Sequence, residues 1–316
     1  MKSGTQTSQP VVVTGAFSYT GKYVTRLLHR RGFRVKTLTA HPDRHNEFGP
    51  AVEALPFHFE NPPELERALC GASSLINTYW IRFPKGGSTF ESAVKNTRTL
   101  FDAAKNAGVK RIVHVSIANP SLDSTLDYYR GKAILEDALE CLGLQYSIVR
   151  PTVIFGREDI LINNIAWFLR KFPLFGIPGD GKYRIRPIFV EDVAALLVDE
   201  VEQLGNGVID AVGPETFTFE ELVKTIAANL AISPILVHLP MPLAYAATRL
   251  LGWLVGDVIL TKQEYAGLMD GLLAPNGPST GKTRLSDWLK TNHHELGATY
   301  SSEVARHFAA VSEITG

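Results

Sequence analysis

Cysteine is scarce in this chain, with only Cys70 and Cys141 among 316 residues. Two cysteines are too few for a disulfide framework, which excludes the class of small secreted proteins stapled by several bridges. The opening residues are polar and contain no apolar signal-peptide core. We therefore expect both cysteines to be buried thiols in a reducing compartment, and we expect a cytoplasmic protein.

Net charge is also lacking, because Lys plus Arg and Asp plus Glu both number 32. A chain without excess positive charge has no electrostatic footprint for nucleic acid or for an anionic membrane. The nine histidines show no metal-ligand spacing, so no metal site is predicted. These absences favour a small-molecule ligand and argue against nucleic acid as a partner.

No long hydrophobic run is uninterrupted. The most apolar stretch, 241–260, contains Arg249 and Asp257. Charges at that depth of a bilayer are costly, so the sequence predicts no transmembrane segment. We interpret 241–260 as a helix that is buried or lies at an interface. The alternative is that it docks on a membrane surface or on another protein.

What the chain does contain is a regular alternation of strand and helix patterns. The clearest helical patterns are 90–108 and 128–142, each ending at or near a glycine. Alternating units buried on both faces predict an α/β fold, a doubly wound parallel sheet of the Rossmann type that binds ligands at the carboxyl ends of its strands. The predicted strands are 11–13, 34–38, 55–59, 74–77, 111–115 and 146–149.

The regular alternation changes after Pro151, which predicts a second, interleaved domain. We predict a dinucleotide-binding domain of residues 1–155 plus about 184–203, and a smaller cap domain for substrate of about 156–183 plus 204–316. After Pro151 we expect a helix at 159–172, a strand at 185–190 that returns to the dinucleotide-binding domain, and an N-cap at Thr218 with Glu221 three residues later. The segment 275–283 lacks the glycine spacing of a phosphate loop and is interpreted as a linker.

A small-residue turn follows the first predicted strand and keeps Gly15 and Gly21, but has Ser18 between them. A helix N-terminus directs unpaired N–H groups and a positive dipole end at any anion bound there. Gly15 allows a tight turn, and Gly21 allows close packing of helix on strand. The side chain of Ser18 either crowds a pyrophosphate or donates its hydroxyl to it. The turn therefore predicts a dinucleotide site with an altered middle position.

Tyr128 and Lys132 lie four residues apart on a predicted helix and hence on one face. A nearby positive charge lowers the pKa of a phenol and makes it a usable acid or base. Ser116 follows the strand 111–115, at the sheet edge where ligands bind. The plainer alternatives are a solvated helix face for the pair and a turn or capping role for the serine.

Together these residues resemble the short-chain dehydrogenase/reductase superfamily in its extended and atypical, epimerase/dehydratase-like branches. The spacing of Gly15, Ser18 and Gly21 is similar to the family's glycine turn, with a departure at Ser18. The segments 96–116, 146–151 and 186–194 resemble its central helix and fifth strand, its strand into the cap, and its returning strand and helix. The chain is most similar in look to the subgroup that contains the NAD(P)-binding accessory subunit of respiratory complex I.

The resemblance implies roles for individual residues. Tyr128 would exchange a proton with the substrate, Lys132 would lower its pKa and bind the nicotinamide ribose, Ser116 would orient the substrate, and Asn96 would support the proton path. The predicted cofactor-binding residues are Gly15, Phe17, Ser18, Tyr19, Thr20, Gly21, His41, Arg44, Asn77, Lys132 and Pro151.

The choice of cofactor follows from what stands after the second strand. No acid occupies the strand tip to accept from the 2′-hydroxyl of NAD, and Arg44 is near enough to reach the extra phosphate of NADP. We therefore predict NADP, with NAD less favoured. The alternative for Arg44 is a surface cation paired with its neighbour Asp43. His58 and Phe59 occupy the place where the family usually offers aspartate to adenine.

Aromatic residues follow two of the predicted strands and predict an apolar or ring-bearing substrate. Tyr79, Trp80 and Phe155 should edge the ligand cleft, although each is equally compatible with a core position. Arg82, Arg184 and Arg186 are candidates to bind an anionic substrate, although single arginines on loops are common surface residues. Two hypotheses follow. One is an NADP-dependent oxidoreductase or epimerase/dehydratase. The other is a non-catalytic NAD(P)-binding redox sensor or accessory and assembly subunit.

Overall fold

The computed structural model describes residues 9–304. The chain divides into two compact units: Met1–Pro151 with Val190–Ala211, and Thr152–Phe189 with Val212–Gly316. Every residue predicted to be catalytic or to bind cofactor belongs to the first unit, so the candidate site can be described within it.

The first unit is built on a seven-stranded sheet in which every neighbouring pair of strands is parallel. The spatial order of the strands is β11-β6-β5-β4-β1-β2-β3. The chain therefore adds β2 and β3 on one side of β1 and the later strands, beginning with β4, on its other side, as in a doubly wound sheet. The predicted fold class is confirmed. The strands are β1 (Val11–Thr14), β2 (Val35–Thr39), β3 (Val52–Pro56), β4 (Ser74–Asn77), β5 (Arg111–Val115), β6 (Gln145–Pro151) and β11 (Gly207–Ala211).

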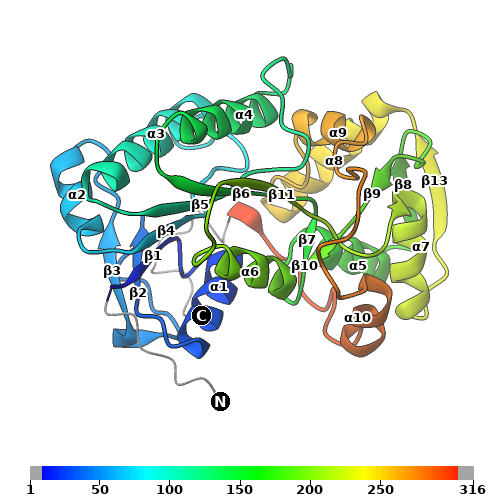
Figure 1. Cartoon of the computed structure of the whole chain (residues 1–316). Coiled ribbons are helices and arrows are strands. Elements are labelled where there is room, and N and C mark those ends of the chain that lie inside the picture. The colour runs from blue at the N-terminus through cyan, green and yellow to red at the C-terminus, as the bar shows by residue number, and fades with distance from the viewer. Residues whose placement is uncertain (1–8, 305–316) are drawn as a thin grey trace. The chain divides into compact units, whose positions relative to one another are not determined.

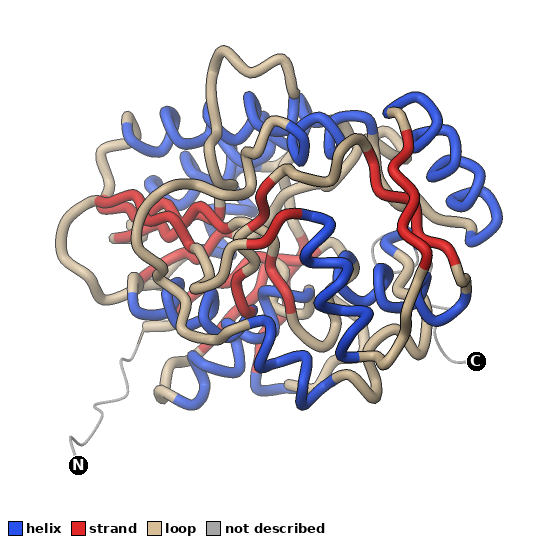
Figure 2. Tube along the Cα trace, turned by 90° about the vertical axis from the view of Figure 1, so that its right-hand side faces the viewer, coloured by secondary structure: helices blue, strands red, loops and turns tan. Residues whose placement is uncertain are grey.

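Helices cover both faces of this sheet, and its central strands β1 and β4 are therefore buried along their whole length. On one face lie α2 (Pro62–Leu69), α3 (Phe90–Asn106) and α4 (Asp127–Glu140). On the other lie α1 (Tyr19–Arg30) and α6 (Val190–Asp199), as Figure 1 shows. In the turned view of Figure 2, helices (blue) again lie on both sides of the strands (red). A short 3₁₀ turn, η1 (Gly49–Ala51), precedes β3.

Local signals explain where several elements begin and end. Thr89 and Ser92 form a reciprocal capping box at the start of α3, which satisfies two of the amide groups that a helix N-terminus leaves unpaired. The predicted strands 74–77 and 111–115 are correct at both ends. The prediction of 55–59 is shifted, because the strand is Val52–Pro56 and the apolar Phe57 and Phe59 stack on one another beyond it.

The second unit combines helices with three two-stranded sheets. Its core joins α5, α7 and α10, and the predicted capping box of Thr218 with Glu221 begins α7. The elements are β7 (Ile154–Phe155), α5 (Leu161–Lys171), β8 (Leu174–Pro178), β9 (Arg184–Ile185), β10 (Ile188–Phe189), β12 (Phe217–Thr218), α7 (Phe219–Asn229), β13 (Ile235–Leu239), α8 (Met241–Val255), α9 (Lys262–Met269) and α10 (Leu285–Asn292).

The helix predicted at 241–260 ends early, because Gly256 adopts the left-handed conformation with φ +65° and closes α8. Its residues Leu243, Leu250 and Trp253 are exposed, with Trp253 at 78%, so α8 is not a buried helix within this chain. Between residues 9 and 304, no helix has both the length and the apolar character needed to cross a bilayer.

One further prediction, that both cysteines are buried thiols, is wrong, and for Phe155 and Arg186 the structure shows contacts within the chain. Cys70 and Cys141 are exposed, because each ends a helix at the surface rather than facing the core. Phe155 is fully buried in the core of the second unit. Arg186 donates to the carbonyls of Gly213, Pro275 and Gly277, so its guanidinium anchors the 275–283 segment.

Candidate functional site

The glycine turn after β1 is as tight as its sequence predicts. Gly15 has φ +64°, a conformation that side chains disfavour. A Cβ on Gly21 would lie 2.0 Å from the carbonyl oxygen of Gly15, so only glycine allows α1 to pack this closely on the turn. Thr37 of β2 supports the turn, because its hydroxyl accepts from the amide of Ala16 and donates to the carbonyl of Val13.

Ser18 is the N-cap of α1, and its hydroxyl donates to the carbonyl of Gly15 at 2.6 Å. The hydroxyl hydrogen therefore helps to close the turn. Tyr19 and Thr20 begin the helix, whose first turn contains no acidic side chain. The N-terminus of α1 thus keeps the positive end of its dipole uncompensated and fits an anion such as a pyrophosphate.

We expect Ser18→Ala to lower the free energy of unfolding by about 1 kcal/mol, because it removes the hydrogen bond within the turn but keeps the Cβ. Dinucleotide affinity should then change by less than about two-fold, or under 0.5 kcal/mol. Chemical denaturation and fluorescence titration measure the two quantities. Loss of affinity with no loss of stability would instead make the hydroxyl a phosphate ligand.

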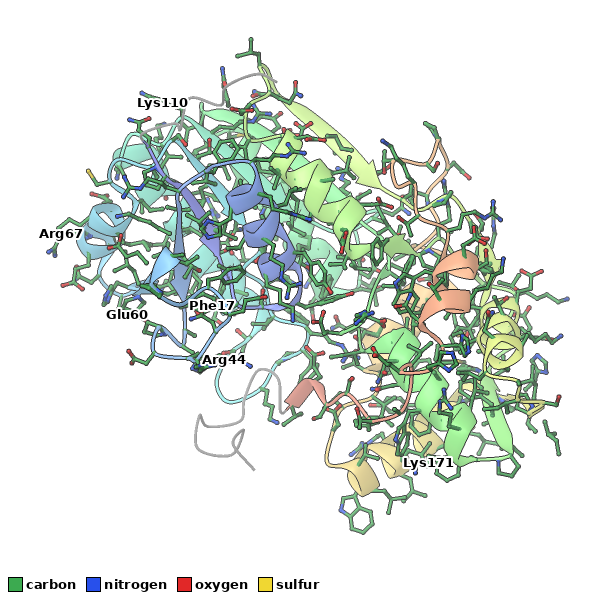
Figure 3. The ribbon with its side chains drawn as sticks, turned by 90° about the horizontal axis from the view of Figure 1, so that it is seen from below. Phe17, Arg44, Glu60, Arg67, Lys110 and Lys171 are labelled. Atoms are coloured by element: carbon green, nitrogen blue, oxygen red, sulfur yellow. The ribbon has the colours of Figure 1, made fainter. Side chains whose placement is uncertain are left out.

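The loops after β1 and β2 lie together at the carboxyl edge of the sheet. Phe17 stacks on Phe48 with ring centroids 6.3 Å apart. Figure 3 shows Phe17 and Arg44 at one end of the first unit. His41 is exposed, and Arg44 is half-buried without an ion pair to any described carboxylate, Asp43 included. The Arg44 guanidinium is therefore available for an anion.

Beneath the turn, Asn77 at the end of β4 belongs to a fully buried polar network. Thr14 donates to the side-chain carbonyl of Asn77 at 3.0 Å, and the Asn77 amide donates to Nδ1 of His114 at 3.0 Å. Burial, together with the nearby charge of Lys132, holds the pKa of His114 well below its usual range. His114 is thus neutral, and its Nε2 has no partner among the described residues.

Lys132 on α4 is anchored at the end of β5. The residue is 2% exposed, and its Nζ donates to the carbonyl of Val115 at 2.7 Å. Nζ also lies 4.5 Å from the centroid of the Trp80 ring, a cation–π distance. Burial lowers the pKa of Lys132 to about 7, against the opposing effect of the Glu136 carboxylate one turn along the helix. Glu136 itself pairs with Arg150 of β6.

This low pKa predicts a measurable effect on stability. The native state binds fewer protons than the unfolded chain between the lowered pKa of Lys132 and its ordinary value, so stability rises with pH across that window. Relative to Lys132→Met, the wild-type free energy of unfolding should rise by about 2–4 kcal/mol from about pH 6 to about pH 10. Denaturant unfolding at the two pH values measures it. A constant difference would mean that Lys132 is not buried as described.

Two other predicted catalytic residues lie close to Lys132. Ser116 directly follows Val115, is 3% exposed, and its hydroxyl has no hydrogen-bond partner within the described residues. Tyr128, one turn before Lys132 on α4, packs edge-on against Trp80 at 5.7 Å. The structure therefore brings Ser116, Tyr128 and Lys132 to the same end of β5.

Asn96 and Pro151 have other contacts. The amide of Asn96 donates to the hydroxyl of Tyr79 at 3.1 Å, and the Tyr79 ring lies 5.1 Å from both Phe57 and Phe59. Pro151 ends β6, and its carbonyl accepts from the amide of Ala118. The side-chain amide of Asn96 is thus hydrogen-bonded to an aromatic cluster and not to Tyr128 or Lys132.

Three features of this site were not predicted from the sequence: the buried His114 bonded to Asn77, the Trp80 ring over Lys132, and the Gly131 position against that ring. His114 carried a usable signal, since a histidine in the middle of an otherwise apolar buried strand needs a polar partner. No sequence signal could have placed Trp80 on Lys132, because the two are 52 positions apart and meet only in the fold.

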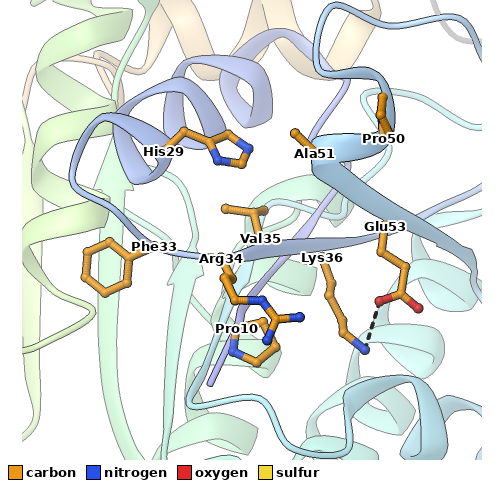
Figure 4. Close-up of a pocket in the computed structure, with 9 residues that line it drawn as sticks. All are labelled: Pro10, His29, Phe33, Arg34, Val35, Lys36, Pro50, Ala51 and Glu53. Carbon is orange, nitrogen blue, oxygen red and sulfur yellow. Dashed lines mark ion pairs between the residues drawn. The ribbon is translucent and has the colours of Figure 1, made fainter. Parts of the chain in front are cut away.

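A pocket in the first unit lies at the edge of the sheet opposite the carboxyl ends of the strands. Its volume is about 470 Å³, and its walls include Pro10, Arg34, Lys36 and Pro50, which precede or begin β1, β2 and β3. Figure 4 shows Lys36 paired with Glu53 at 3.0 Å. Ligands of doubly wound sheets bind at the carboxyl ends of the strands, so this pocket is not the nucleotide site.

No group of three or more His, Cys, Asp or Glu side chains between residues 9 and 304 is placed to hold a metal ion. A glycine turn at a helix N-terminus, an unpaired buried serine hydroxyl and an anchored lysine fit a dinucleotide instead. The fold and this edge define an NAD(P)-binding Rossmann-like protein.

Comparison with known proteins agrees. Residues 15–163 match the family described as NAD(P)H-binding. The chain is 26% identical over 261 residues to NADH dehydrogenase (ubiquinone) 1 alpha subcomplex subunit 9, mitochondrial, of Arabidopsis thaliana, covering 78% of this chain and 64% of that protein. It is 27% identical over 238 residues to the ceramide reductase of Caulobacter vibrioides, covering 73% and 74%.

Among solved structures, the triphenylmethane reductase of Citrobacter sp. complexed with NADP(H) is similar in fold, with a TM-score of 0.72 at 16% identity and coverage of 89% of this chain and 99% of that one. As the resemblance implied, the chain has an NAD(P)-binding Rossmann-like domain, with epimerase/dehydratase-like neighbours in fold and with relatives among the mitochondrial NADH dehydrogenase subunits at 26–30% identity. Its match spans less than two thirds of the plant subunit's length.

Proposed function

We propose that this protein is an NADP-dependent oxidoreductase that transfers hydride to or from a carbonyl or hydroxyl carbon of a small molecule. An epimerase or dehydratase using the same residues is the closest variant of this proposal. The observation that carries it is the buried, unpartnered hydroxyl of Ser116, beside the strand end where Lys132 is anchored. An unsatisfied buried polar group is costly and marks a place where a polar ligand atom fits.

The bound nicotinamide supplies or accepts the hydride. Tyr128 exchanges a proton between its hydroxyl and the substrate oxygen, and Ser116 donates to that same oxygen. Lys132 in its charged form favours the phenolate of Tyr128. The Asn96 amide supports the proton path, and to do so it must give up its hydrogen bond to the Tyr79 hydroxyl.

The Gly15–Gly21 turn and the N-terminus of α1 would hold the pyrophosphate of the cofactor. Aromatic side chains near the pair, Trp80 and Phe90 among them, support an apolar or ring-bearing substrate.

The preference for NADP depends on Arg44. We expect Arg44→Ala to weaken NADPH binding about 10- to 100-fold and to leave NADH within about two-fold, because only NADPH carries the 2′-phosphate. Isothermal titration with both cofactors measures this selectivity. Arg67→Ala on α2, a surface arginine paired with Glu64, is the matched control and should change neither affinity. An equal loss of affinity for NADPH and NADH would show that Arg44 does not bind the 2′-phosphate.

The function itself is tested by NADPH and NADH titration of the wild type, followed by turnover on a panel of aldehydes and ketones that includes aromatic ones. Cofactor binding with NADPH oxidation supports the proposal. Tight binding without oxidation of NADPH by any member of the panel, and without reduction of NADP by the matching alcohols, would overturn it.

The second candidate is a non-catalytic NAD(P)-binding redox sensor or accessory subunit. It is supported by the similarity to the named mitochondrial NADH dehydrogenase subunits, at 26–30% identity. The exposed apolar side chains of α8 would then dock a protein or a membrane surface. In this case cofactor binds but the panel stays unreacted. The compartment would be the cytoplasm for a stand-alone enzyme and the site of assembly for a subunit.

A further inference from the structure

The indole of Trp80 covers the ammonium of Lys132. Nζ lies 4.5 Å from the centroid of the ring, and Lys132 is 2% exposed. The carbonyl of Val115 accepts from Nζ at 2.7 Å. The ammonium is therefore held between a strand-end carbonyl and the face of one aromatic ring, which attracts a cation through its quadrupole.

Trp80 is itself fixed by its neighbours. Its ring stacks on Phe90 at 6.0 Å and meets the edge of Tyr128 at 5.7 Å. It also lies against Gly131 on α4, where an added Cβ would be 2.9 Å from the Cη2 atom of the indole. Glycine in the middle of a helix is unfavourable by about 0.5–1 kcal/mol relative to alanine, so its presence here needs a reason. Room for Trp80 is that reason.

We propose that Trp80 is the positioning residue of the Tyr128–Lys132 pair: its indole holds the Lys132 ammonium against Val115 and packs on the Tyr128 ring, in space that Gly131 leaves open. The catalytic consequence rests on the proposed function, whereas the positioning of Lys132 does not. Other titratable groups face Lys132 from its own helix, where Glu136 is bound to Arg150, and from β5, where His114 is neutral.

The test labels the full-length protein with acetic anhydride at several pH values. Mass spectrometry of the peptide that contains Lys132 then gives the rate at which this lysine is labelled. Labelling should be slow in the wild type. In Trp80→Ala it should become at least about 10-fold faster, because removing the ring opens the ammonium to solvent. Trp80→Phe should restore slow labelling, since phenylalanine keeps an aromatic face. Trp167→Ala, the same truncation in the second unit, is the control and should leave the rate unchanged.

Gly131→Ala displaces Trp80 without deleting it and favours the helix, so it guards against a variant that fails to fold. It should also accelerate labelling of Lys132. In both variants kcat should fall about 10- to 100-fold with a shifted pH profile and a smaller change in KM, because a misplaced acid/base pair slows the chemical step.

Unchanged labelling in both Trp80→Ala and Gly131→Ala would overturn the proposal, as would faster labelling with normal kcat and an unshifted pH profile. If the wild type itself binds cofactor but turns over nothing, the proposed function fails. The labelling rates then still decide whether Trp80 positions Lys132.

Discussion

Replacing Tyr128 with phenylalanine will lower turnover by about 10²- to 10⁴-fold, the usual contribution of a positioned acid or base. The phenyl ring keeps the edge contacts with Trp80 and Phe90, so only the hydroxyl is lost. Affinity for NADPH should stay within about two-fold, because the glycine turn proposed to hold the pyrophosphate is at the start of α1 and not on α4. Steady-state kinetics and cofactor titration measure the two effects.

Tyr129→Phe is the matched control, since Tyr129 is the next residue on the same helix and is buried at 6% exposure. It should leave kcat near the wild-type value. If Tyr128→Phe retains full turnover while Tyr129→Phe does not, the catalytic phenol has been assigned to the wrong tyrosine. If both variants keep full turnover, the acid or base is not a phenol of this helix.

Gly21→Ala has the second large expected effect. Its Cβ would lie 2.0 Å from the carbonyl oxygen and 2.8 Å from the carbonyl carbon of Gly15, and both are backbone atoms that no side-chain rotation can move. The turn must open, so the free energy of unfolding should fall by about 2–4 kcal/mol. NADPH affinity should fall at least about 100-fold, because the helix amides no longer converge on one anion site.

Gly207→Ala serves as the comparison, because Gly207 begins β11 in the same unit and an added Cβ there meets nothing within 4 Å. Thermal unfolding and cofactor titration of both variants measure the difference. A Gly21→Ala protein with wild-type affinity would show that the dinucleotide does not use this turn.

The local pattern of the chain was enough for much of the fold. Apolar runs at 74–77 and 111–115 are bounded by polar or turn residues, so their ends are the ends of β4 and β5. The prediction of a strand at 55–59 was wrong at both ends, because an apolar run does not distinguish the residues of a strand from aromatic residues that pack just beyond it. Val52–Pro56 pairs with β2, while Phe57 and Phe59 pack with Tyr79 after the strand has ended.

The candidate site divides in the same way. Gly15, Ser18 and Gly21 are close in sequence, and their turn geometry follows from local conformational limits. Lys132 could be chosen by its spacing from Tyr128, but its burial and its lowered pKa depend on Val115 of β5 and on Trp80 from the loop after β4. Whether these residues act on a substrate, and whether the two units are separate cofactor and substrate domains, stay predictions.

The sequence by itself determined the doubly wound α/β class and the tight glycine turn at Gly15–Gly21, since both depend on residues within a few positions of one another. Only the tertiary structure decided that the two cysteines are exposed, that Arg186 anchors a loop and that Trp80 covers Lys132. Burial and charge state depend on neighbours tens of residues away, and a linear pattern does not specify which of them meet.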